Sequence, residues 1–346
     1  MPKAIKTKRI RPLSWSRFLT RNLLVSSRVL GKRHEFKFEK HNVEVALPNP
    51  DIAEVAEEPS MLSQAEKYRV AIAGRSTDDQ NMPTRIAIES ADIVIQLPMK
   101  VEIDLRMLET PPNRPEFAGE EQVQELNALS EEYSNLASRA FEYWLRVMRW
   151  KSEDPTIGRP AIRGFESGWS TYLVSPKSRT RFWAGPLAFD IVVKDPIDIR
   201  TWNEVEKALN QSLEPPLYYN YLFDSIEHSK TDDLPQAVVE LSTSSELFIR
   251  TKTMQAVSID LLPVMRDYLD EANIRFVMRK FFLELLSKKG AKYFKRISSS
   301  LHALFNDRNT ILHSGRKEDL SRDEFLRYLD ATRKLIHMAD DEEYWH

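Results

Sequence analysis

The hydrophobic period of this chain changes near residue 200, and the change limits which folds the chain can adopt. Before it, many apolar residues alternate with polar ones, which is the period of a half-buried β-strand. After it, apolar residues recur every three or four positions, as they do along one face of an α-helix. Strands followed by helices, rather than alternating with them, predict an α+β fold.

The expected strands occupy the first part of the chain and are separated by short polar or proline-rich links. They are Phe36 to Phe38, Val43 to Leu47, Tyr68 to Ile72, Arg85 to Ile88, Ile93 to Leu97, Val101 to Leu105, Thr171 to Val174, Arg179 to Trp183 and Leu187 to Lys194. One long amphipathic helix, residues 120–150, interrupts them. We therefore expect a strand-rich domain over residues 41–200, a sandwich or curved sheet with this helix on one face.

The C-terminal part, residues 201–346, is expected to be a helical bundle. Its helices are predicted at Thr201 to Ser212, Leu217 to His228, Asp232 to Met254, Asp260 to Ala272, Arg275 to Ser287, Ala291 to His313 and Ser321 to Asp340. Asp232 or Asp233 is a suitable N-cap for the third helix. Ser321, with Glu324 three residues later, has the spacing of a capping box.

Residues 1–40 form a basic arm with twelve Lys or Arg residues against Glu35 and Glu39. Three interpretations fit this composition. The arm packs against the acidic middle of the chain, it contacts nucleic acid, or its Arg- and Ser-rich start is an organelle transit peptide.

The segment Ser298 to Gly315 carries the pattern that is most informative about function. On a helix, Leu301, Leu304, Phe305 and Leu312 share an apolar face, and Arg308 falls in the middle of that face. A second row on an adjacent face is polar and comprises His302, Asn306, Asn309 and His313. A buried Arg needs a carboxylate partner or an incoming anion, because its guanidinium stays charged.

Two carboxylates on the preceding long helix, Glu240 and Glu246, are candidate partners for Arg308. The region around Arg308 is also strongly basic. Residues 275–317 hold eleven Lys or Arg residues against two acidic ones, a distribution that attracts polyanions. Residues in this window that we expect to contact such a polyanion, with His302 and Asn306, are Lys292, Lys295, Arg296, Arg316 and Lys317.

The stretch Arg308-Asn309-Thr310-Ile311-Leu312-His313 resembles the R-polar-x-x-x-H signature of the HEPN superfamily. Upstream, residues 234–250 are similar to the first long helix of such domains. Within the superfamily the chain is most similar to the Apea-like, abortive-infection group. It departs from the antitoxin-paired branch, because Ser314-Gly315 stands where that branch has a Tyr.

This resemblance implies a helical HEPN-like bundle and a metal-independent endoribonuclease without a cofactor, acting in phage defence or as a toxin. It also implies catalytic roles for Arg308, Asn309 and His313, with His302 as our own addition. Related domains pair two copies, so we expect a homodimer through the helical domain. The RNA would be tRNA, mRNA or rRNA, and the N-terminal region would sense a protein trigger or respond to an antitoxin.

Two other interpretations stay open. A noncatalytic HEPN-like domain would bind RNA, a nucleotide or a protein partner, and an accidental motif would leave an unrelated helical interaction module. The chain has no Cys, which excludes disulfides and thiolate zinc sites and fits a reducing cytoplasm. No apolar run of about 18 residues occurs, so we expect no membrane span.

Overall fold

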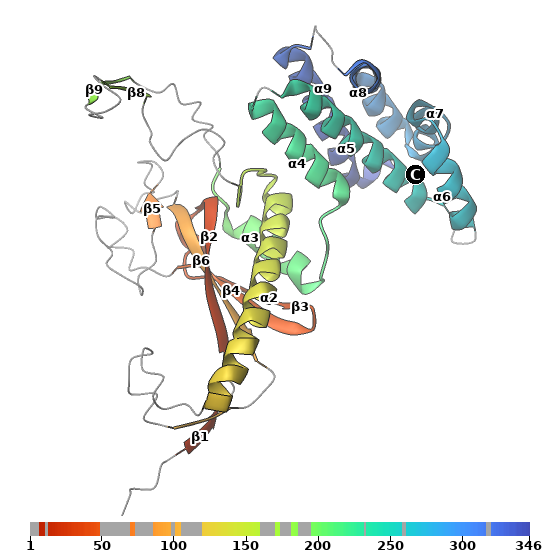
Figure 1. Ribbon diagram of the computed structural model, residues 1–346. Coiled ribbons are helices and arrows are strands. Elements are labelled where there is room, and N and C mark those ends of the chain that lie inside the picture. The colour runs from red at the N-terminus through yellow and green to blue at the C-terminus, as the bar shows by residue number, and fades with distance from the viewer. Residues whose placement is uncertain are drawn as a thin grey trace, which may run out of the picture. The chain divides into compact units, whose positions relative to one another are not determined.

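The computed structural model describes residues 7–10, 13–48, 70–72, 86–97, 101–104, 120–159, 170–173, 181–185, 195–231, 233–257, 261–315 and 320–346. The chain divides into two compact units, Met1–Glu214 and Pro215–His346. The first is built on antiparallel β-sheet and the second is helical (Figure 1). The α+β fold predicted from the change of hydrophobic period is therefore confirmed.

A five-stranded antiparallel sheet forms the centre of the first unit. Its strands run in the order β2 (Leu13–Val25), β6 (Ile86–Gln96), β4 (His41–Ala46) and β3 (Arg33–Phe38), and β5 (Val70–Ile72) also pairs with β6. Two further antiparallel pairs are β1 (Thr7–Ile10) with β7 (Val101–Asp104), and β8 (Ser170–Leu173) with β9 (Arg181–Gly185). The expected strand Leu187 to Lys194 lies outside the described residues.

Helix α2 (Glu120–Ser152) packs against this sheet, as predicted for residues 120–150 (Figure 1). The ring of Phe141 stacks on Phe18 of β2 with centroids 4.9 Å apart, and Trp144 is fully buried. These aromatic side chains supply much of the apolar area that holds helix and sheet together.

A buried histidine joins β3 to two helices. The indole Nε1 of Trp144 donates to His34 Nδ1 at 2.9 Å, and His34 Nε2 lies 3.1 Å from the carbonyl oxygen of Trp202. Trp202 lies on α3 (Ile199–Asn210), which Asp198 caps by accepting from the backbone N–H of Thr201. Because α3 packs in this way, the boundary between the units falls at 214/215 and not near residue 200 as expected.

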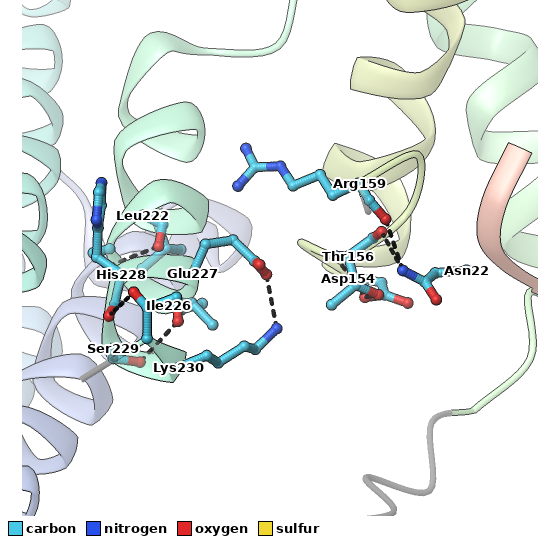
Figure 2. A network of polar contacts seen from close by, with 12 residues as sticks. Asn22, Asp154, Thr156, Arg159, Leu222, Ile226, Glu227, His228, Ser229 and Lys230 are labelled. Carbon is cyan, nitrogen blue, oxygen red and sulfur yellow. Dashed lines mark hydrogen bonds and ion pairs between the residues drawn. The ribbon is translucent and has the colours of Figure 1, made fainter. Parts of the chain in front are cut away.

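The basic arm expected over residues 1–40 is wrong for residues 13–38, because most of them form β2 and β3. β2 contains an irregularity between Leu19 and Leu23, where Arg21 and Asn22 have positive φ angles of 41° and 55°. The Asn22 amide donates to the carbonyl oxygen of Arg159 at 2.8 Å (Figure 2). This hydrogen bond connects the loop that follows α2 to the irregular part of β2.

The second unit consists of six longer helices and short 3-10 turns in its described residues. They are α4 (Leu217–Lys230), α5 (Leu234–Gln255), α6 (Leu262–Glu271), α7 (Ile274–Lys280), α8 (Lys288–Ser314) and α9 (Arg322–His337). The helix expected over Arg275 to Ser287 ends early, at Lys280, and a 3-10 turn Phe282–Leu285 follows. Among the described helices, none combines the length and apolar composition needed to cross a bilayer.

Helix α5 lies at the centre of this unit and contacts α4, α8 and α9. Its small serines allow close approach: Ser244 donates to the Tyr218 carbonyl of α4 at 2.7 Å, and the Ser245 hydroxyl lies 2.8 Å from that of Thr332 on α9. Late in α4, Lys230 Nζ lies 2.7 Å from Glu227 Oε1 (Figure 2). The predicted Asp233 N-cap of α5 is confirmed.

Candidate functional site

Helix α8 carries the residues that the sequence singled out. Its N-cap is Ser287, whose hydroxyl accepts from the backbone N–H of Gly290, and its C-cap is Gly315 with a φ of 74°. Gly tolerates this left-handed conformation, and α8 ends at Ser314, one residue after the expected end at His313. Helix α9 then begins at the capping box of Ser321 and Glu324, as predicted.

One face of α8 belongs to the core. Leu301, Leu304 and Phe305 are buried as expected. The expectation for Leu312 is wrong, because its side chain is 58 % exposed and Ile311 is buried in its place. Toward its C-terminus the buried row thus continues through Ile311, one position before Leu312, and Leu312 is left on the surface.

Arg308 lies at the border of this core face and forms an ion pair with Glu246 of α5. Its Nη1 is 3.5 Å from Glu246 Oε2, and the two side chains are 28 % and 18 % exposed. The predicted pairing with Glu246 is confirmed. The alternative, Glu240, is wrong as a partner, since its carboxylate accepts from Gln236 on the same helix at 2.7 Å.

Glu246 also binds a second guanidinium, which the sequence interpretation missed. Arg250 Nη2 lies 2.6 Å from Glu246 Oε1 and donates to the Ala272 carbonyl at 2.9 Å. The spacing of Glu246 and Arg250, four residues on one helix, was the available signal. One carboxylate therefore serves two guanidinium groups, and the cluster keeps a surplus positive charge.

The cluster also contains donors without acceptors. Arg308 Nε and Arg250 Nη1 are buried and have no hydrogen-bond partner within the described part of the chain. A buried N–H of a charged group is costly to leave unsatisfied. Surplus charge and free donors are the chemical features that an oxyanion satisfies.

The predicted polar row of α8 faces away from the core. Asn306, Asn309 and His313 are exposed, and His302 is half-buried. Burial lowers the pKa of the His302 imidazole, and the positive charges of Arg275 and Arg279 lower it further. His302 is therefore neutral at pH 7 and can accept a proton or a hydrogen bond.

The three residues of the signature do not point the same way within one chain. At 100° per residue, Arg308 and His313 lie about 140° apart around α8. In the described structure no hydrogen bond joins Asn309 to His313, although Asn309 precedes His313 by about one helical turn. Arg308 is turned to Glu246 on α5 and His313 is turned to solvent.

The expected RNA contacts lie on α8 where they are described. Lys292, Lys295 and Arg296 are exposed on its first half. Arg316 and Lys317 lie outside the described residues. Across the described ranges, no group of three or more acidic, His or Cys side chains could hold a metal ion.

No protein-family model matches the chain, and no curated protein or solved structure matches it either.

Proposed function

We propose that this protein is a metal-independent endoribonuclease of the HEPN type. The observation that carries the proposal is the position of Arg308, which Glu246 holds at the edge of the core with one nitrogen unsatisfied, on a helix that also carries the exposed Asn309 and His313. A phosphodiester offers the oxyanion that such a guanidinium lacks. The side chain is only partly buried, as a group that meets a ligand must be.

The proposed reaction is transesterification at an RNA phosphate. The 2'-oxygen bonds to phosphorus as a base removes its proton, and the bond to the 5'-oxygen breaks as an acid protonates that oxygen. The products are a 2',3'-cyclic phosphate and a 5'-hydroxyl. Arg308 stabilises the charge on the phosphorane, Asn309 hydrogen-bonds the phosphate, and His313 transfers protons.

One His313 cannot be the base and the acid of the same step, so the proposal includes a homodimer with a composite site. Its support is geometric. Arg308 and His313 diverge around α8, and two exposed leucines, Leu312 and Leu326, flank the connection between α8 and α9. Exposed apolar side chains beside a functional surface are typical of an interface.

The biological role that we propose is cytoplasmic RNA cleavage in phage defence or as a toxin, in which the β-sheet unit senses a protein trigger or responds to an antitoxin. A noncatalytic domain that binds RNA, a nucleotide or a protein is the second candidate. The observation in its favour is that Glu246 already neutralises part of the Arg308 charge. An accidental motif would favour a fully buried Arg308, and this side chain is 28 % exposed.

The deciding experiment incubates the purified full chain with total RNA and with tRNA in EDTA. Wild type is compared with His313→Ala and with His346→Ala, a matched control at another exposed histidine. We expect cuts from wild type and His346→Ala and none from His313→Ala. Binding of RNA without cuts by all three proteins would favour the noncatalytic domain.

A further inference from the structure

Two arginines of α7 stand beside the polar row of α8. The Nη2 of Arg275 donates to Asn306 Oδ1, which connects the two helices. Arg279, one helical turn after Arg275, donates from Nε to the Arg275 carbonyl at 3.4 Å. Both guanidinium groups lie close enough to His302 for their charges to act on its imidazole.

These two arginines are not neutralised. Within the described ranges, neither Arg275 nor Arg279 has an ion pair with a carboxylate, whereas Arg250 and Arg308 share Glu246. Like charges at positions i and i+4 of a helix repel each other. An anion between the two guanidinium groups would reduce this repulsion and stabilise the arrangement in which Arg275 is bonded to Asn306.

The side chains of Arg275, Arg279, His302 and Asn306 offer hydrogen-bonding groups that suit a phosphate. Two guanidinium groups offer planar pairs of N–H donors, and Asn306 offers an amide. His302 is half-buried and carries no charge at neutral pH, so it adds a donor or an acceptor without adding repulsion.

We propose that Arg275, Arg279, His302 and Asn306 form a subsite for a phosphate of an RNA strand, separate from the phosphate that is cut. The proposal rests on RNA as the ligand of the proposed function. The midpoint between His302 and Asn306 lies four residues before Arg308, or about 6 Å along α8, and nine residues before His313, or about 14 Å. This separation places the bound phosphate outside the reacting group and gives the subsite a role in substrate binding rather than in chemistry.

The test uses a single-stranded 2'-O-methyl oligonucleotide, which lacks the attacking hydroxyl, so that binding is measured without cleavage. The full chain carrying Arg275→Gln and Arg279→Gln is compared with wild type and with Lys280→Gln, which removes an exposed charge from the same helix. We expect the double variant to bind at least about tenfold more weakly, with a salt slope smaller by about one. Lys280→Gln should change the affinity less than about twofold.

An NMR titration of the His302 ring supplies a second readout. The oligonucleotide should raise the pKa of His302 in wild type, because a phosphate next to the imidazole favours its protonated form. Equal affinities for the double variant and Lys280→Gln would overturn the proposal, as would a wild-type protein that does not bind the oligonucleotide. Binding through Arg275 and Arg279 without any cleavage of unmodified RNA would support the subsite and refute the nuclease.

Discussion

The carboxylate of Glu246 lies between two guanidinium groups, with Arg250 Nη2 at 2.6 Å and Arg308 Nη1 at 3.5 Å. Arg250 is the closer partner and belongs to the same helix, so it binds Glu246 regardless of what Arg308 does. Arg308 reaches the same carboxylate from α8. If Arg308 moves to bind a phosphate, the carboxylate of Glu246 therefore stays paired with Arg250.

This asymmetry predicts unequal effects of two substitutions on stability. Glu246→Ala should lower the free energy of unfolding by about 1 to 3 kcal/mol, because two partly buried cations lose their shared anion. Arg308→Ala should cost less than about 1 kcal/mol, since Glu246 keeps Arg250. Urea unfolding measures both, with Glu240→Ala as the control. If Arg308→Ala unfolds the protein, Arg308 is a structural residue.

Arg308→Ala, which should cost little stability, should have a large effect on RNA cleavage. We expect Arg308→Ala to abolish RNA cleavage while the thermal melt stays nearly unchanged, because the guanidinium is needed for the phosphorane and not for the fold. The measurement is cleavage of tRNA in EDTA beside a melting curve of the same sample. Residual cleavage close to wild type would remove Arg308 from the mechanism.

The composite site predicts a specific result for mixed dimers. If one His313 is the base and the other is the acid, a dimer of wild type and His313→Ala is inactive. After unfolding and refolding an equal mixture, about a quarter of the wild-type activity would remain, against about half for independent sites. Cleavage rates across a series of mixing ratios distinguish the two curves. A linear dependence on the wild-type fraction would argue for sites within single chains.

How far the sequence predicted the structure depended on whether the stabilising contacts were local. The capping box of Ser321 and Glu324 is local and was predicted, and α8 ends at Ser314, within one residue of the expected His313. β6 was expected as two strands, because its middle, Ser90-Ala91-Asp92, resembles a turn. Asp92 is buried in the strand because Arg17 of β2 binds it at 2.8 Å.

The same reasoning explains what was found and missed in the candidate site. Helical periodicity placed Arg308 in the middle of the apolar face, whereas its side chain lies at the border and is 28 % exposed. Of the two candidate partners, Glu240 and Glu246, only Glu246 pairs with it. β2 was missed because its arginines suggested a basic arm separate from the strand-rich domain, although an antiparallel strand with one solvent face can carry them. Arg275 was counted only as charge, because its bond to Asn306 crosses between two helices.

Gly290 provides a test of how the C-terminal residues are held. A Cβ at Gly290 would overlap the carbonyl oxygen of Tyr344, which also accepts from the Ser287 backbone N–H at 3.0 Å. Gly290→Ala should therefore destabilise the full chain by about 1 to 3 kcal/mol. In a chain that ends at Asp340 the same change should be neutral or stabilising by up to about 1 kcal/mol, because Ala favours the helix. Equal effects in both chains, measured by urea unfolding, would contradict this contact.

His34 predicts how the stability of the β-sheet unit depends on pH. Burial lowers its pKa from 6.5 to about 4, although the hydrogen bond with the Trp202 carbonyl opposes this. Because the Trp144 indole can only donate, His34 Nδ1 accepts and Nε2 carries the proton, so the folded protein holds the ring neutral.

Protonation consequently favours the unfolded state. The contribution of His34 is complete above pH 6.5, falls as the pH drops from 6.5 to about 4, and reaches a total loss of about 3 kcal/mol. Urea unfolding monitored by Trp fluorescence should show this loss in wild type, beyond what other groups contribute. His34→Gln, which does not titrate, should be less stable at pH 7 but less sensitive to acid. Parallel pH profiles for the two proteins would show that His34 is not the group responsible.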